Sequence, residues 1–410
     1  MIVFVDPISN LHGWAYSPQQ ELDGIEQLKR ILISYPIPSL MKGVRMGSVI
    51  HISGQETLEE LHMKLDGFTL SINQYGSAKI DRGDDIERIG NLPLITLHDP
   101  IIDNRYKSLG ALDISYNPAL SIKDIMARQM VDDAIQDGHI IKGKTIIAEA
   151  TSGNTGAGIA LMGAIYGNNV VLIVPNKVSE EKINRLIKFG AHVIVAPTKV
   201  SPTDPHSYYS IRDYIGTKDN VWVPQQYDNL SNTKAHYLYT GPQIWKETKG
   251  EVTTVIIPTG TSGTISGIGR YLKERNRNIK IIGVDTIGSI LYLLKKGYAL
   301  EDVQHLSHSY DIQGFGEDIY PKNLDLTVID EYIRVSDISG LTMTRILPAL
   351  GVFQGQSSGA SYVALLEAIH RGLVTKKDSV VLMFPDSAIP YRNDVFNDEW
   401  MKDKKFSINY

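Results

Sequence analysis

The chain has 410 residues, of which 42% are hydrophobic, and a formal net charge of -5 at pH 7. This length can bury the cores of two or three domains, and the mixed charges leave no basic stripe for a nucleic-acid backbone. The absence of cysteine excludes disulfides, zinc–thiolate and iron–sulfur sites and a thiol nucleophile in this chain.

Residues 1–85 are predicted to form a small α/β appendage. An opening strand should lead into a first helix, followed by a short strand at residues 51–53 and a second helix. The apolar positions that indicate these helices are Leu22, Ile25, Leu28 and Leu32 in the first and Leu58, Leu61 and Leu65 in the second. The stretch 76–85, GSAKIDRGDD, predicts a linker.

The amino terminus and the hydropathy pattern bear on localisation. The opening residues MIVFVDPISN carry neither a basic leader nor an apolar stretch of secretory length. No segment is long enough to span a membrane. We therefore expect a soluble, cytoplasmic protein.

From about Thr145 onward, short β-branched runs alternate with segments of helical period. The predicted strands are 145–150, 170–175, 191–197, 253–258, 280–285 and 380–385. Such alternation is typical of βα units and parallel sheets, whose strands are apolar because helices cover both faces. A ligand site is expected at the carboxyl ends of these strands.

The segment 117–130, NPALSIKDIMARQM, contains an Asn-Pro turn, a capping Ser121 and then Lys123 in the first helical turn. A cation is disfavoured at the amino end of a helix, so the ammonium form of Lys123 should be destabilised. That property suits an amine nucleophile that forms Schiff bases. The alternative is a solvated surface lysine.

Two further segments predict anion-binding turns that follow strands. In 256–270, IIPTGTSGTISGIGR, glycines let the main chain approach a phosphate, and three hydroxyls add donors. The segment lacks the Walker lysine and the G-x-G-x-x-G spacing, and the alternative is a mere tight connection. In 151–156, TSGNTG, close packing of a helix would explain Gly156 but not Asn154.

A fourth segment, 352–369, VFQGQSSGASYVALLEAI, predicts a helix of apolar period with Ser357 and Ser358 as its caps.

In this order and spacing, the segments resemble the fold type II pyridoxal-phosphate enzymes, specifically the cysteine synthase and cystathionine β-synthase branch. The blocks that carry the likeness are IGNLPLITL (from Ile89), NPALSIKD, TSGNTG, QQYDNLSN, GTSGT, DIQGFGEDI, GQSSGAS and FPDS. The likeness covers about residues 86–391. It implies an α/β fold like that of the tryptophan synthase β chain, with two parallel-sheet αβα domains. Residues 86–120 and 225–400 would form the large cofactor domain, and 121–224 the small substrate domain.

The resemblance also implies the site residues. Lys123 would hold pyridoxal 5'-phosphate as a Schiff base and later remove the α-proton of the substrate. Asn154 would contact the ring hydroxyl, and Ser357 the ring nitrogen, which a serine leaves unprotonated and therefore better suited to elimination than to transamination. The implied phosphate cradle is Gly260, Thr261, Ser262, Gly263 and Thr264. The implied contacts of the substrate carboxylate are Thr151, Ser152, Thr155 and Gln226.

The implied reaction is a β-replacement on O-acetylserine or O-phosphoserine through an aminoacrylate, with sulfide as the acceptor. An amine acceptor, in a diaminopropionate, siderophore or other specialised pathway, is the nearest alternative. A catalytically silent regulator that binds pyridoxal phosphate or amino acids is an alternative of another class. The partners implied are a small amino-acid substrate and a second copy in a homodimer, without nucleic acid or membrane.

Some positions depart from the family pattern. The family has Arg where this chain has Ile125, Gly where it has Leu120, and FPDSGERY where it has FPDSAIPY. These departures affect substrate choice and carboxy-terminal packing rather than cofactor binding. Arg212 could meet a substrate phosphate, but we expect it on the surface of a helix. No metal site is expected, because His305 and His308 lie in a polar stretch without a carboxylate cluster.

Overall fold

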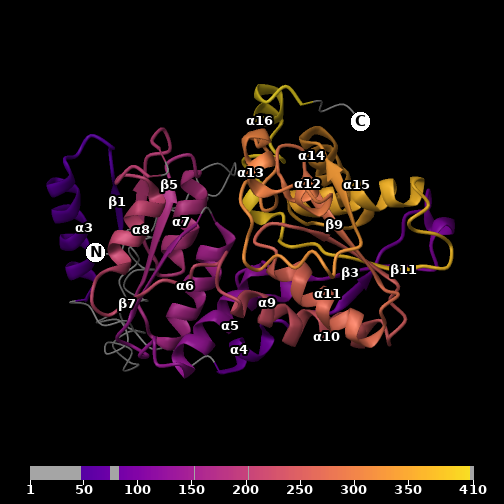
Figure 1. The fold of residues 1–410 in the computed structure, drawn as a ribbon, viewed down its shortest axis with the longest axis horizontal. Helices are drawn as coiled ribbons and strands as arrows, with labels where there is room; N and C mark the ends of the chain where they lie inside the picture. The colour runs from indigo at the N-terminus through magenta and orange to yellow at the C-terminus, as the bar shows by residue number, and fades with distance from the viewer. Residues whose placement is uncertain (1–47, 74–82, 152, 202, 407–410) are drawn as a thin grey trace, which may run out of the picture. The chain divides into compact units, whose positions relative to one another are not determined.

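A computed structural model describes residues 48–73, 83–151, 153–201 and 203–406 (Figure 1). The strands are β1 (Val49–His51), β2 (Leu94–Thr96), β3 (Ser108–Leu112), β4 (Ile146–Ala150), β5 (Val170–Pro175), β6 (His192–Ala196), β7 (Val221–Trp222), β8 (Thr254–Pro258), β9 (Lys280–Thr286), β10 (Glu331–Val335) and β11 (Ser379–Leu382).

The α-helices are α3 (Leu58–Asn73), α4 (Gly83–Arg88), α5 (Lys123–Gln136), α6 (Asn154–Tyr166), α7 (Glu180–Lys188), α8 (Tyr208–Gly216), α9 (Ser231–Ala235), α10 (Gly241–Glu247), α11 (Gly263–Arg275), α12 (Leu291–Lys295), α13 (Leu300–Val303), α14 (Asp337–Ile346), α15 (Gln356–His370) and α16 (Asp398–Asp403). A π-helical turn, His236–Thr240, joins α9 to α10. Short 3-10 turns occupy Asp103–Arg105, Ile114–Tyr116, Gln304–Leu306, Leu347–Leu350 and Ile389–Tyr391.

The strands form two sheets. One has five parallel strands in the order β1-β6-β5-β4-β7. The other has six strands in the order β10-β9-β8-β11-β3-β2, parallel except for the pair β2 and β3. Parallel strands need helical crossovers, and helices therefore cover both faces of each sheet.

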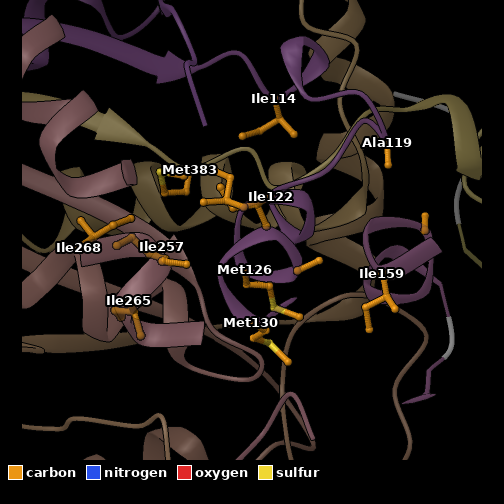
Figure 2. Close-up of a cluster of buried hydrophobic side chains, with 14 of the residues drawn as sticks. Ile114, Ala119, Ile122, Met126, Met130, Ile159, Ile257, Ile265, Ile268 and Met383 are labelled. Carbon is orange, nitrogen blue, oxygen red and sulfur yellow. The ribbon is translucent and has the colours of Figure 1, made fainter. Parts of the chain in front are cut away.

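The core follows the alternation of side chains along the strands. In β4, Ile146 and Ala148 join a cluster with α3 and α8 on one face, whereas Ile147 joins the cluster on the other face. That second cluster continues through α5 to the six-stranded sheet. Figure 2 shows Met126 and Met130 of α5 within it, together with Ile257 of β8. The buried helix α5 thus joins the cores of the two sheets.

The predicted strands from residue 145 onward are confirmed as β4, β5, β6, β8, β9 and β11. The predicted strand at residues 51–53 overlaps β1, and the predicted second helix of the amino-terminal region is α3. β1 pairs in parallel with β6, so this strand extends the five-stranded sheet. The opening strand, the first helix and residues 76–82 of the expected linker lie outside the described residues. The proposed domain boundaries stay predictions.

Candidate functional site

Lys123 lies in an enclosed pocket where strand ends of the six-stranded sheet meet the start of α5. The pocket is lined by Ile122, Lys123, Ile257, Pro258, Gly260, Thr261, Ser262, Thr264, Ile265, Gly314, Met383 and Pro385. Burial lowers the pKa of the Lys123 amine, although the charges of Glu317 and Asp386 oppose this shift. An amine whose pKa is lowered in this way gives up its proton more readily than that of a solvated lysine, as a nucleophile and base requires.

The turn before α5 fixes where Lys123 enters the pocket. Leu120 has a φ of 60°, in the left-handed region that disfavours side chains. The Ser121 Oγ accepts a hydrogen bond from the Lys123 N–H at 3.1 Å. The prediction that Ser121 caps this helix is wrong, since Ile122 is the N-cap residue and no side chain caps α5. The Asp124 carboxylate accepts from the Ala119 N–H at 2.6 Å. These contacts hold the strained turn in place.

The predicted phosphate loop forms the opposite wall of the pocket and runs into the amino end of α11. Ser262 has a φ of 69°. A Cβ on Gly263 would lie 2.0 Å from the Asn232 Oδ1, so only glycine fits there. The Asn232 Nδ2 donates to the Thr261 Oγ1 at 2.9 Å. Main-chain N–H groups, hydroxyls and the helix dipole together make this loop a suitable anion site.

A histidine that the sequence did not indicate supports this loop. The His236 Nε2 lies 3.1 Å from the Thr264 Oγ1, and its Nδ1 lies 2.9 Å from the Thr240 Oγ1. Burial lowers the pKa of His236 to about 3. The ring is therefore neutral and positions Thr264 without adding charge. No local motif marks this residue, because its role depends on a contact across 28 positions.

The predicted substrate loop follows β4. The Thr155 Oγ1 donates to the Gln226 Oε1 at 2.7 Å, so the structure brings these two candidates together. Thr151 is buried, and its Oγ1 accepts from the Gly153 N–H at 3.3 Å. Ser152 lies outside the described residues. Two of the expected carboxylate contacts thus belong to one hydrogen-bonded group.

Behind this loop lies Glu149, whose carboxylate accepts from the Gln226 N–H at 3.3 Å. Burial raises the pKa of Glu149 to about 7, and Arg212 opposes the shift from 3.9 Å. The side chain of Arg212 is only 16% exposed. The guanidinium of Arg212 bonds the exposed Asp213 at 2.6 Å, as expected for a residue on a helix surface, and also lies near the buried Glu149.

Asn154 is held from both sides at the start of α6. Its Nδ2 donates to the Asp386 Oδ2 at 2.6 Å, and its Oδ1 accepts from the Arg185 Nη1 at 3.3 Å. Tyr391 also donates to Asp386. Because Arg185 and Asp386 bond opposite ends of the amide, the orientation of Asn154 is fixed. Sequence reasoning named neither of these two partners.

Ser357 is buried in the first turn of α15. Its Oγ would lie 4.0 Å from a Cβ placed on Gly314, which lines the Lys123 pocket. The prediction that Ser357 and Ser358 cap this helix is wrong, since Gly355 is the N-cap residue and no side chain caps the helix. Buried at this position, Ser357 is free for another role.

Comparisons with known proteins agree with this geometry. The family model described as "Pyridoxal-phosphate dependent enzyme" matches residues 87–386. A cystathionine beta-synthase of Apis mellifera is 37% identical over 331 residues, which cover 79% of this chain and 63% of that protein. Cysteine synthase 3 of Caenorhabditis elegans is 36% identical over 71% of this chain and 82% of its own length. The crystal structure of an O-acetylserine dependent cystathionine beta-synthase from Helicobacter pylori matches with a TM-score of 0.66 and 30% identity, over 76% of this chain and 97% of that one.

The chain spans 63% of the length of the first cystathionine beta-synthases it matches. None of the helices in the described part of the chain is long and apolar enough to cross a membrane. The described residues also contain no group of three or more His, Cys, Asp or Glu side chains that could hold a metal ion.

Proposed function

Because this chain belongs to the family of pyridoxal-phosphate dependent enzymes, we propose that it catalyses a β-replacement on an O-activated L-serine. The observation that carries this proposal is one pocket that joins the Lys123 amine to an anion loop at the start of α11. The predicted fold type II architecture is confirmed, and the cofactor is pyridoxal 5'-phosphate.

The residues of the pocket fit this cofactor. A Cβ on Gly260 would lie 3.3 Å from the Gly314 main-chain oxygen, so glycine keeps the space beside the loop open. Gly260, Thr261, Ser262, Gly263 and Thr264 would hold the phosphate through main-chain N–H groups and hydroxyls. When bound, the cofactor supplies an electron sink that stabilises negative charge at the substrate Cα.

Lys123 would anchor the cofactor covalently and then move the proton at Cα. Because burial lowers the pKa of its amine, Lys123 loses its proton more easily than an exposed lysine, and both tasks require the unprotonated amine. Asn154, held by Arg185 and Asp386, would direct its amide toward the ring hydroxyl. Ser357 would meet the ring nitrogen as a hydroxyl, which supports elimination and replacement at Cβ over transamination.

The substrate carboxylate would rest on the loop after β4. Thr151, Ser152 and the amide N–H groups of Gln226 offer donors for it. Thr155 donates its hydroxyl proton to the Gln226 Oε1 and so holds that amide in place. Carboxylate binding there would orient the Cα–H bond toward Lys123. Closure of the pocket around the substrate would exclude water from the reactive Cβ.

The donor is proposed to be O-acetylserine or O-phosphoserine, and sulfide is the leading acceptor. The relatives named cysteine synthase and O-acetylserine dependent cystathionine beta-synthase support this substrate class. Replacement by an amine uses the same residues and is the second candidate. The protein is further proposed to be a homodimer. Each subunit would have a large domain, residues 86–120 and 225–400, and a small domain, residues 121–224.

A spectroscopic titration tests the function. The purified, cofactor-loaded protein is titrated with O-acetylserine and, separately, with O-phosphoserine while the visible band of the cofactor is followed. We expect a red shift with one donor and its reversal when sulfide is added. The Lys123→Ala variant should lose the band of the covalently attached cofactor. No shift with either donor, or an unchanged band in Lys123→Ala, would contradict the proposal.

A further inference from the structure

Gln226, a proposed contact of the substrate carboxylate, is held through three of its four polar groups. Its main-chain N–H donates to the Glu149 Oε2 at 3.3 Å. Its main-chain oxygen accepts from the Asn232 Nδ2 at 2.9 Å and from the Asn323 Nδ2 at 3.2 Å. Its side-chain oxygen accepts from the Thr155 Oγ1 at 2.7 Å. Within the described residues, the Nε2 of Gln226 is the group left over, and its N–H groups can donate to a carboxylate.

Glu149 is the acidic residue among these partners, and it lies buried near the end of β4. Its Oε1 accepts from the Ala150 N–H at 2.9 Å, while its Oε2 accepts from Gln226. Both carboxyl oxygens therefore face main-chain donors. The ionised carboxylate accepts at both positions, whereas a protonated carboxyl or an amide would present a donor to one of them. The contact with Gln226 thus depends on the charge of Glu149.

The turn that Glu149 holds is a strained one. Gln225, directly before Gln226, has a φ of 53°, and such a conformation persists only where surrounding contacts fix it. Main-chain N–H groups face the carboxylate from β4 and from this turn, and Arg212 of α8 is the charged group that faces it. The Arg212 Nη1 lies 3.9 Å from the Glu149 Oε1 and bonds Asp213 on its exposed side through Nη2. Arg212 therefore supports the ionised form of Glu149.

We propose, resting on the β-replacement function above, that Glu149 is a positioning residue for the donor substrate. Its ionised carboxylate holds the turn of Gln225 and Gln226 so that the Gln226 Nε2 donates to the α-carboxylate of the amino acid. Glu149 acts through Gln226 and not by contact with the donor or the cofactor. The ligands that benefit are α-amino acids with a free carboxylate, and an amine without a carboxylate gains nothing from this arrangement.

The preference for a carboxylate should depend on pH in a defined direction. Burial raises the pKa of Glu149 to about 7, and the charge of Arg212 opposes the shift. Above about pH 7 the carboxylate forms and holds the turn. As pH falls through about 7 the carboxyl takes up a proton, so the part of donor binding that depends on the α-carboxylate should weaken. Donor binding favours the ionised form and releases a proton.

Two ligands separate carboxylate recognition from the general integrity of the site. The visible band of the cofactor-loaded protein is titrated with L-serine and with ethanolamine, which is serine without its carboxylate. Both amino groups are largely protonated between about pH 6 and pH 8, so the ratio of the two affinities is insensitive to them. In Glu149→Gln we expect the affinity for L-serine to fall about tenfold and that for ethanolamine to change less than about twofold. The matched control Asp213→Asn changes the exposed carboxylate beside Arg212 and should leave the ratio unchanged.

The outcomes separate this inference from the function on which it rests. Equal losses for both ligands in Glu149→Gln, or an unchanged affinity for L-serine, overturn the role of Glu149 and leave β-replacement standing. A preference for L-serine without turnover of O-acetylserine overturns β-replacement alone. A wild-type band that shifts with neither amino acid overturns both.

The wild type decides if Glu149→Gln fails to fold. Its preference for L-serine over ethanolamine must decrease from about pH 8 to pH 6. In Arg212→Gln the decrease must begin at a higher pH, because the loss of the cation raises the pKa of Glu149 further. A preference that stays constant over this range in the wild type overturns the inference.

Discussion

Leu120 offers a test of how the lysine turn is built. Its φ of 60° places a half-buried leucine in the left-handed region, which costs a side-chain-bearing residue about 1–2 kcal/mol. The perturbation is a pair of variants, Leu120→Ala and Leu120→Gly. Both variants remove the packing of the leucine side chain. The difference between their free energies of unfolding therefore reports the cost of a Cβ in this backbone conformation.

Glycine is usually less stabilising than alanine, but at position 120 we expect the opposite order of stability. Glycine relieves the strain of about 1–2 kcal/mol but loses about 0.5–1 kcal/mol through the greater entropy of its unfolded chain. Leu120→Gly should therefore be more stable than Leu120→Ala by about 0.5–1 kcal/mol. Leu70, exposed within α3, provides the control, because there Leu70→Gly should be less stable than Leu70→Ala by about 1 kcal/mol.

Urea unfolding followed by circular dichroism measures all four variants, and the midpoints are compared within each pair at equal slope. Greater stability of Leu120→Ala than of Leu120→Gly would refute the reasoning, because the strained turn would then carry no penalty for a Cβ. The same variants report on function. Leu120→Ala and Leu120→Gly should differ by less than about tenfold in the rate of covalent cofactor attachment, because the hydrogen bond from the Lys123 N–H to Ser121 remains in both.

Three further predictions concern the site. Gly263→Ala should weaken cofactor binding about tenfold or more, because the new Cβ would lie 2.0 Å from the Asn232 Oδ1; fluorescence titration of the cofactor-free protein measures this, and unchanged affinity would disprove the close packing. Thr155→Val removes the 2.7 Å hydrogen bond to Gln226 and should raise KM for the donor about fivefold to tenfold, for a loss of about 1 kcal/mol, with a smaller change in kcat; a fall in kcat alone would argue for another role. Burial raises the pKa of Asp124 to about 7, so the folded state binds more protons than the unfolded state between about pH 4 and pH 7. Wild-type stability relative to Asp124→Asn should therefore decrease over that interval as pH rises, and a relative stability that increases over it would contradict the shift.

The sequence predicts the strands that are buried on both faces better than the others. β5 and β8 consist mainly of β-branched residues, and all their side chains are buried, so composition alone identifies them. β3 was not predicted, because its central Gly110 fits against β2, where a Cβ would lie 3.1 Å from the Ile95 main-chain oxygen. β10 was also missed, since it lies at a sheet edge and its short run of buried residues is interrupted by the exposed Arg334. Both strands depend on contacts between distant segments.

The same distinction applies to the site. Lys123 and the loop from Gly260 to Thr264 could be proposed from the sequence because each lies in a local pattern of strand, turn and helix. Asp386 and Arg185 were missed because their contacts with Asn154 span 232 and 31 positions. Glu317 was missed for the same reason, since only the fold brings it to Gly260. A single sequence shows turns but not which side chains from other segments complete them.

Half of the described non-glycine residues with strained backbone lie at these turns. Six described residues other than glycine have positive φ, and three of them, Leu120, Gln225 and Ser262, lie within or directly beside the lysine turn, the Gln226 contact and the phosphate loop. Such conformations persist only where surrounding contacts over-determine them. Hydrogen bonds from neighbouring segments supply those contacts at each turn, such as the bond from Asn232 to Thr261. Pre-formed turns would lower the ordering cost of binding an anionic ligand, and residues remote in sequence supply part of the contacts that hold these turns.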